Sequence, residues 1–410
     1  MAPIILSAGT PVRLLILLTC LAVAGDVRAQ ALPSEPISVA NGRFVFGAEV
    51  FATFGDADPG FFNYTDYEYG AFRNVRLAVS TEVRVSRRMQ VLAELRLDHG
   101  DQLTPYALFV RVRPWPGRRF DVQVGRVPPT FGAFNKTVYA YSNLVIGQPL
   151  AYQYLLSIKP DAVPRTADDL LRMRGRGWLS DFPVGLARAS PGMPIVNTAR
   201  FDSGVQVHGV AGPVEWTGAL TTGSLSDPRV GDNNGRPQVS TRVVAQLAPG
   251  FRVGGSAAHG PWLDAALNSA IPGGVRASDF AQSAVAADVE VSQGAWLARA
   301  ELLRSAWNLP ALGTPAIDAP LVARSLIVEG RYRVWPGVSV SARADGLWFS
   351  DVAGSAGVQP WEANQRRLET ALSVAITRNL IAKGAWQRNH RQGGRVRHDS
   401  LVAAQLVYWF

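Results

Sequence analysis

The sequence has 410 residues, of which 47% are hydrophobic and 18% are charged, and a formal net charge of +9. Its single cysteine, Cys20, lies in an apolar leader, so the chain after residue 29 offers no disulfide scaffold, cysteine-ligated zinc or cysteine nucleophile. Its arginines are scattered singly instead of clustered, which argues against nucleic-acid binding. After residue 30 no apolar run of about 18 residues occurs, so the chain could span a bilayer only as a barrel.

The N-terminus has the pattern of a signal peptide. An apolar run over residues 14–24 follows an arginine, and small or short residues stand where cleavage requires them. We therefore expect residues 1–29 to be removed. The mature chain would begin at Gln30, with Gly25 as the other candidate start, and residues 30–42 would form a short polar lead.

Five segments before residue 127 alternate apolar and polar residues with a period of two, which predicts strands with one apolar face. The connection Ser86–Arg88 is short enough for a tight hairpin, and the connection Pro114–Gly117 for a turn, whereas residues 54–70 form an acidic, aromatic loop. In the fourth segment, Tyr106 is expected to share a face with the apolar residues that follow it. The five segments cover residues 43–53, 75–83, 89–97, 106–112 and 120–124.

The alternation lapses over residues 127–202, here called the insertion. A connection of this length is uncommon in a compact domain, and its many apolar residues are unlike those of a disordered segment. We expect it to fold back into the interior and to narrow it. Counted from Arg126, nine basic residues outnumber five acidic ones over this stretch, so the narrow part should be net positive.

Eleven further alternating segments follow the insertion, giving sixteen in all. Short and long connections alternate along the whole chain, and the count is even, as in transmembrane antiparallel β-barrels whose two ends lie on the same side of the membrane. We therefore expect residues 43–410 to form an all-β barrel of about sixteen strands. The eleven segments cover residues 203–211, 213–222, 238–248, 251–259, 280–291, 295–305, 322–335, 338–349, 366–377, 380–389 and 398–410.

The last segment ends the chain on Phe410. Counting back by twos gives Tyr408, Leu406, Ala404 and Val402, which form one apolar face of a strand. This stretch resembles the terminal strand of bacterial outer-membrane β-barrels, in which a final Phe and an aromatic two places before it are read by the barrel-assembly machinery. The resemblance implies that Phe410 and Tyr408 are an assembly signal. It also implies a Gram-negative outer-membrane location, contact with outer-membrane lipid, and a periplasmic lead. A soluble β-sandwich, the alternative, would not require the alternation of connection lengths.

If the apolar faces meet lipid, the opposite faces form the wall of the lumen. These faces carry charges of both signs, which are costly in hydrocarbon and ordinary beside water. A barrel of about sixteen strands is wide enough for an aqueous channel, so we expect a wet lumen whose wall charges pair with their neighbours. Trp115 and Trp335 in short turns and Trp348 near a strand end fit aromatic girdles at the two interfaces.

The residues Gly125 to Gly132 resemble the Gly-x-x-x-x-Pro-Phe-Gly turn that precedes the long constriction loop of the phosphate-selective porin family, with Thr130 interrupting the Pro-Phe step. The resemblance implies a trimer of sixteen-stranded barrels with inward loops that favour anions. The family's lysine-rich constriction has no counterpart, because Lys136, Lys159 and Lys383 are the only lysines.

Three arginines in the insertion, Arg172, Arg174 and Arg176, are spaced by two. If this stretch is extended, their guanidinium groups form a row suited to oxyanions and carboxylates. The row could instead pair with nearby aspartates and only hold the insertion in place. As the constriction and anion-binding residues we predict Arg126, Arg172, Arg174 and Arg176, together with the wall residues Arg111, Arg113, Arg331, Arg333 and Arg343.

The sequence gives little support for an enzyme. The five histidines are scattered without metal-ligand spacing, and there is no nucleophile elbow, phosphate-binding loop or dinucleotide fingerprint. No metal site and no cofactor are expected. A hydrolase site made by a histidine and a serine or aspartate that converge on one wall stays open as an alternative.

The predicted function is therefore that of an outer-membrane porin for small polar solutes, with anion preference set by arginines of the insertion and the wall. Its partners would be lipid, the assembly machinery, the solutes and two further copies in a homotrimer, with no nucleic acid. The main alternative is a barrel plugged by the insertion that serves as an adhesin or an anchor.

Overall fold

The computed structural model describes residues 33–64, 70–99, 102–115, 117–186, 188–272 and 274–410. The predicted signal peptide therefore lies outside the described residues. Glu35–Phe410 forms one unit of the chain. No helix in the described ranges is both long enough and apolar enough to cross a membrane.

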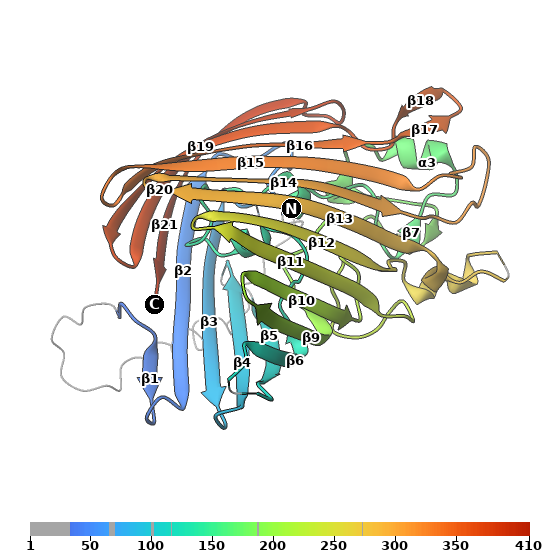
Figure 1. Ribbon diagram of the computed structural model, residues 1–410. Helices are drawn as coiled ribbons and strands as arrows, with labels where there is room; N and C mark the ends of the chain where they lie inside the picture. Colours follow the sequence, from blue (N-terminus) through green and yellow to red (C-terminus); the bar gives the residue numbers. More distant parts are fainter. Residues whose placement is uncertain (1–32, 65–69, 100–101, 116, 187, 273) are drawn as a thin grey trace, which may run out of the picture. The chain divides into compact units, whose positions relative to one another are not determined.

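Sixteen antiparallel strands form a closed barrel (Figure 1). Each pairs with the barrel strands before and after it in the sequence, and the first and last close the ring by pairing residues 49–55 with residues 403–409. The predicted fold class and strand number are confirmed. The barrel strands are β2 (Phe44–Gly55), β3 (Asn74–Arg84), β4 (Met89–Asp98), β5 (Gln102–Val112), β6 (Phe120–Val127), β9 (Asp202–Ala211), β10 (Val214–Thr221), β11 (Gln238–Ala248), β12 (Phe251–Pro261), β13 (Ala281–Gln293), β14 (Trp296–Trp307), β15 (Leu321–Trp335), β16 (Val338–Phe349), β19 (Gln365–Thr377), β20 (Leu380–Arg391) and β21 (His398–Trp409).

The connections alternate between short turns and long loops. Gly212, Gly250, Gly294 and Gly337 lie in short turns with positive φ, a conformation that glycine adopts without steric cost. At the opposite ends, the long loops carry structure of their own. It consists of the 3-10 helices η3 (Ala265–Ser269) and η4 (Ala277–Asp279) and the hairpin of β17 (Asp351–Gly354) and β18 (Gly357–Pro360).

A short strand that the periodicity did not predict, β1 (Ile37–Val39), lies within the expected N-terminal lead. It pairs with residues 44–46 of β2, on the same edge that β21 uses further along. Phe410 exchanges backbone hydrogen bonds with Ala48, so β21 stops short of the first residues of β2, and β1 continues the edge there (Figure 1). The hairpin of β1 and β2 therefore extends a few residues beyond Phe410.

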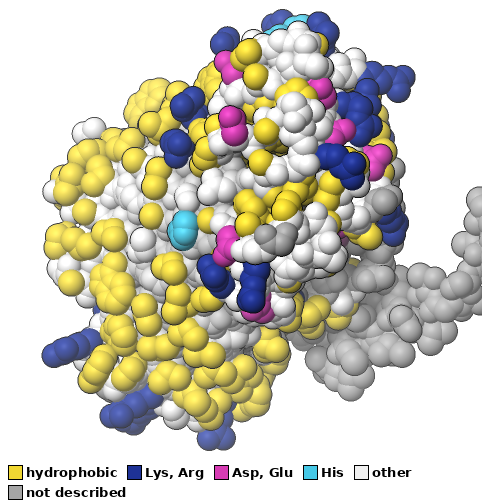
Figure 2. Space-filling view, turned by 90° about the vertical axis from the view of Figure 1, so that its right-hand side faces the viewer, with side chains coloured by type: hydrophobic (Ala, Val, Ile, Leu, Met, Phe, Trp, Pro, Cys, Tyr) yellow, Lys and Arg dark blue, Asp and Glu magenta, His cyan; other side chains and the backbone are white. Residues whose placement is uncertain are grey.

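The two faces of the wall have the predicted polarity. In β21, Val402 and Leu406 are 56% and 47% exposed, whereas the alternate residues Leu401 and Val407 are buried. Figure 2 shows hydrophobic side chains spread over the outer surface on its lower left side. The apolar outer face follows from the period of two, because successive strand residues point to opposite faces.

The outer face also carries arginines, which the sequence analysis did not anticipate. Arg304, Arg324, Arg366 and Arg388 are exposed and alternate in register with outward apolar residues. Each lies within four residues of a strand end that joins a long loop. Near an interface a charge on the lipid face is far less costly than at the bilayer centre.

The predicted orientation of the Tyr106 side chain is wrong. The register of β4 and β5 shifts, so that Glu94 pairs with Ala107 and Leu95 with Pro105, which leaves Tyr106 as the extra residue of a bulge. Its ring is buried, and its hydroxyl donates to the carbonyl oxygen of Thr198 in the insertion. The bulge therefore turns Tyr106 away from the exposed face of Leu108.

The insertion is folded, and its side chains provide much of the main apolar core. This core packs its rings and aliphatic side chains, such as Phe131 and Leu156, against wall and loop residues that include Trp307, Leu321 and Trp361. Burial of such side chains is a main source of stability for a segment that lies against a polar wall. Its elements are η1 (Asn135–Val138), α2 (Leu150–Gln153), β7 (Ala162–Val163), α3 (Ala167–Arg172), η2 (Gly177–Leu179) and β8 (Val184–Gly185).

Candidate functional site: the insertion and the charged wall

The first part of the insertion is bound by carboxylates of the wall. Glu301 of β14 accepts hydrogen bonds from the Ala133 backbone N–H at 2.9 Å and from the Tyr152 hydroxyl at 2.7 Å. The Leu150 N–H, at the start of α2, donates to Asp345 Oδ2 at 2.6 Å. Gly132 has a φ of +85°, and a Cβ at this position would collide with the Tyr152 hydroxyl. These contacts require glycine at the entry to the insertion.

Residues 140–147 are bound by three charged wall residues. Glu369 Oε1 accepts from the backbone N–H groups of Ile146 at 3.0 Å and Gly147 at 2.8 Å. Arg343 donates to the Gly147 carbonyl at 2.6 Å and to Asn143 Oδ1 at 2.7 Å. Lys383 Nζ donates to the carbonyl oxygens of Ala140 and Asn143, both at 2.6 Å. The wall thus satisfies backbone groups that would otherwise be buried without a partner.

A carboxylate of the long loop between β16 and β19 binds the later part of the insertion. Glu362 accepts from the backbone N–H groups of Ser157 at 2.9 Å and Gly175 at 2.5 Å. Burial raises the pKa of Glu362 above its usual value of 4.5, while the backbone donors act in the opposite direction. Arg367 also donates to the Gln148 carbonyl at 2.9 Å. The insertion is therefore held by strands from around the barrel and by one of its long loops.

Many wall charges are paired, as predicted, but those beneath the insertion are not wet. Arg343 and Glu369 are fully buried, and Glu329 lies between Arg343 at 2.6 Å and Arg299. The expectation of a water-covered wall is wrong for these strands because the insertion covers it and supplies hydrogen-bond partners. Further ion pairs between wall arginines and wall carboxylates among the described residues are Arg76–Asp98, Arg84–Glu82, Arg96–Glu94, Arg111–Asp121, Arg242–Asp288 and Arg252–Glu215.

The predicted wall arginines fall into two groups. Arg343 contacts the insertion directly but is buried. Arg331 and Arg333 lie on the same face of β15 as Glu329, nearer the short turn, and are exposed, with no ion-pair partner among the described residues. Arg111 lies 3.9 Å from Asp121, and Arg113 is exposed just after β5.

The predicted arginine row of the insertion is not extended. Arg172 ends α3, Gly175 has a φ of +71°, and η2 follows, so the spacing of two does not align the three guanidinium groups on a strand face. Arg174 donates to Gln359 Oε1 at 3.1 Å, and Arg176 is exposed. The alternation failed as a guide because these residues form a helix end and a turn, where side chains do not repeat every second residue.

Arg126 also lies apart from the other predicted residues. In the pairing of β5 and β6 it is opposite Leu108, an exposed residue of the outer face, and it donates to the carbonyl oxygens of Pro105 and Phe201. The register therefore places it on the outer face and not in a constriction.

Sequence reasoning missed the residues that contact the insertion most closely. These residues are Glu301, Asp345, Glu369 and Lys383. Their spacing in the sequence is the same as that of the exposed charged residues of the wall, so it does not set them apart. One signal was available for Lys383, because it is the single lysine on a wall whose cations are otherwise arginines.

Two histidines contact side chains of the kinds found in hydrolase sites. His259 and Ser283 are cross-strand neighbours on the outer face, with 2.8 Å between Nδ1 and Oγ. No carboxylate contacts His259 in the part of the chain that the structure describes, and β12 and β13 are paired on both edges, so their backbone N–H groups serve the sheet. His208 lies between Asp121 and Glu215, at 3.6 and 3.0 Å, without a serine nucleophile among its contacts. The His259 pair therefore lacks the orienting acid of a serine hydrolase, and the His208 group lacks its nucleophile.

Among the described residues, no cluster contains three or more histidine, cysteine, aspartate or glutamate side chains that could hold a metal ion.

The fold is that of bacterial outer-membrane porins. No family model matches the sequence, and no curated protein matches it. Among solved structures, the chain is similar to Salmonella typhi OmpF in a complex with daunomycin (8% identity, TM-score 0.53, covering 90% of this chain and 97% of that one). It is also similar to the anion-selective porin from Comamonas acidovorans (8%, 0.52, 90% and 99%) and to the outer membrane channel DcaP of Acinetobacter baumannii (10%, 0.51, 90% and 95%). At these identities the similarity concerns the fold alone.

Proposed function

We propose that this chain is a porin of the Gram-negative outer membrane that lets small polar solutes diffuse through and favours anions. The observation that carries this proposal is a closed barrel with an apolar outer face and an insertion bound by the charged inner wall. Such an insertion narrows the lumen without requiring the barrel to change. The signal peptide over residues 1–29 and recognition of Phe410 and Tyr408 by the assembly machinery belong to the same proposal.

The anion preference is supported by the charges that have no internal partner. Several wall carboxylates pair with arginine and others accept hydrogen bonds from the insertion, whereas Arg331 and Arg333 are exposed on the inner face without an ion partner among the described residues. Rings of basic side chains favour anions in pores. The resemblance of residues 125–132 to the phosphate-selective porins further suggests a homotrimer.

Planar-bilayer recording under a salt gradient tests this function. A reversal potential that shows anion preference is expected, and a cation-selective channel would contradict the proposal. The triple variant Arg172→Ala, Arg174→Ala and Arg176→Ala tests the arginine row. Increased conductance and reduced anion preference are expected if these residues face the solute path, whereas unchanged values would assign them to holding the insertion.

A plugged barrel that acts as an adhesin or anchor is the second candidate. It is supported by the burial of Arg343, Glu329 and Glu369 on the inner wall. Folded protein that carries no current in bilayers, at any voltage that the membrane withstands, would select this function over a porin.

A further inference from the structure

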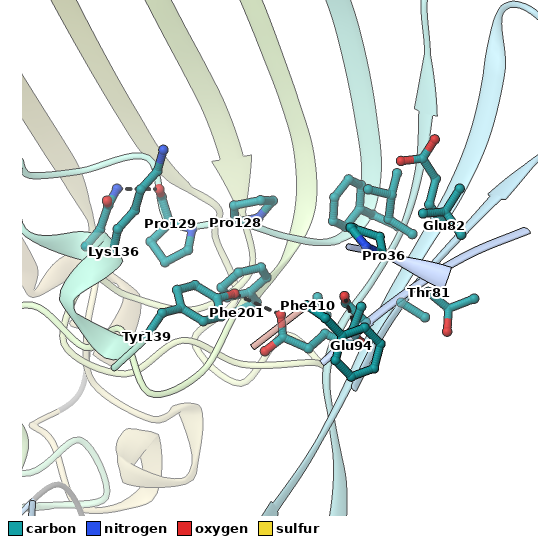
Figure 3. A pocket seen from close by; sticks show the side chains of 18 residues that line it. Pro36, Thr81, Glu82, Glu94, Pro128, Pro129, Lys136, Tyr139, Phe201 and Phe410 are labelled. Carbon is teal, nitrogen blue, oxygen red and sulfur yellow. Dashed lines mark hydrogen bonds between the residues drawn. The ribbon is translucent and has the colours of Figure 1, made fainter. Parts of the chain in front are cut away.

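A cavity of about 470 Å³ lies between the insertion and the wall formed by β2 to β5 (Figure 3). In Figure 3, Lys136, Pro129 and Tyr139 come from the insertion, and Glu82, Pro36 and Phe410 lie across from them. Apolar side chains, including Leu92, Phe109 and Phe201, make up much of the remaining lining. Its size is within the range of cavities that hold small organic molecules, about 300–1,000 Å³.

The carboxylates of this cavity are already neutralised by neighbouring arginines. Glu82 accepts from Arg84 Nε at 2.7 Å, and Glu94 accepts from Arg96 Nε at 2.6 Å. Glu94 also accepts from the Tyr139 hydroxyl at 2.8 Å, and the Arg96 guanidinium lies over the Tyr139 ring. Neither carboxylate is therefore available as a free negative charge.

Lys136 is the charge that stays free. Its side chain is exposed, and within the described residues no carboxylate lies within ion-pair distance of its ammonium group. Counting the pairs Glu82–Arg84 and Glu94–Arg96 as neutral, Lys136 is the remaining charged side chain of the lining. An ammonium group beside an apolar wall attracts an anion more strongly than it would in bulk water.

The apolar lining decides which anions fit. A small inorganic oxyanion would lose hydration there and gain only the contact with Lys136, whereas an organic anion also buries its hydrocarbon body. We propose that this cavity binds small organic carboxylates with an apolar body, and that Lys136 binds the carboxylate. This inference rests on the proposed porin function, because it makes the cavity a binding site on the solute path.

The position of the cavity agrees with such a path. Pro128 and Pro129 also line a second, narrow cavity of about 30 Å³, whose other residues include Arg200 of the insertion and Thr221 and Gln238 at strand ends that join a long loop. The two cavities therefore share one edge of the insertion.

The test uses the full mature protein folded in nonionic detergent, with benzoate binding measured by calorimetry. Lys136→Met should weaken benzoate binding about tenfold or more, because it removes a charge and keeps the apolar stem. Lys136→Arg should stay within about threefold of wild type, since the charge is kept. Arg188→Met removes an exposed cation of the insertion outside the cavity lining and should leave benzoate binding unchanged.

Two further probes define the ligand class. Benzyl alcohol, which has the ring without the charge, should bind weakly and equally to wild type and Lys136→Met. Inorganic phosphate should not displace benzoate at equal concentration. The inference is overturned if benzoate binds wild type and Lys136→Met equally, or if phosphate competes as well as benzoate does.

Bilayer recordings on the same protein separate this inference from the porin function. Current that benzoate reduces in wild type but not in Lys136→Met supports both. If no current is observed but benzoate binding depends on Lys136, the porin function is contradicted and the binding site is supported. If current is observed but benzoate binding does not depend on Lys136, the binding site is contradicted and the porin function is supported.

Discussion

Lys383→Met should loosen the insertion from the wall without unfolding the barrel. The Lys383 ammonium binds the carbonyl oxygens of Ala140 and Asn143 at 2.6 Å and is buried. Methionine fills a similar volume but cannot donate. A buried acceptor left without a donor costs about 1–3 kcal/mol, so the loss of both bonds should weaken docking of the insertion by about 2–6 kcal/mol. A loss near the middle of this range raises the undocked population by roughly 1,000-fold.

The barrel itself should stay intact, because its strands are joined by backbone ladders that Lys383→Met does not touch. Single-channel recording should therefore show larger or noisier conductance, and limited trypsin digestion should cut the insertion sooner than in wild type. Arg252→Met is the matched control. Arg252 is a half-exposed wall cation whose one ion pair, 3.8 Å to Glu215, does not involve the insertion. If Lys383→Met behaves like Arg252→Met in both assays, the wall charges do not hold the insertion.

Three other outcomes follow from the structure. Gly132→Ala should make the insertion more sensitive to trypsin, because the new Cβ collides with the Tyr152 hydroxyl; unchanged digestion would show that the turn can adapt. Since burial raises the pKa of Glu362, the folded state binds its proton more tightly than the unfolded state does. The urea midpoint of wild type should therefore fall relative to Glu362→Gln as pH rises above 4.5, and the opposite trend would contradict the raised pKa. Deletion of Phe410, which pairs with Ala48, should lower the yield of heat-modifiable, membrane-inserted barrel on gels; a normal yield would exclude an assembly role.

The strand pattern could be predicted because it depends on local sequence alone. A strand with one face to lipid and one to the interior needs an alternation that is visible in every segment, from Phe44 to Phe410. The places where this reasoning failed are places where the ladder is irregular. Tyr106 occupies a bulge that reverses its face, and β1 is too short to show a period.

The candidate site could be predicted only in part. The sequence indicated that the insertion was too long and too apolar to be a simple loop, and the structure shows it to be folded and bound by the wall. The spacing of Arg172, Arg174 and Arg176 suggested a row only under the assumption of extended backbone, which α3 and η2 do not satisfy.

The sequence by itself determined the architecture of this protein, namely sixteen strands, the polarity of their two faces and the place of the one long interruption. Periodicity and connection length are properties of neighbouring residues, so no partner from elsewhere in the chain is needed to recognise them. Only the tertiary structure decided which charges stay free. Arg343 and Lys136 are both single basic residues in the sequence, but Arg343 is buried between Glu329 and Asn143, while Lys136 is left exposed beside an apolar cavity. Whether a charge is paired depends on residues that lie far away in the chain, and these meet only when the barrel closes around the insertion.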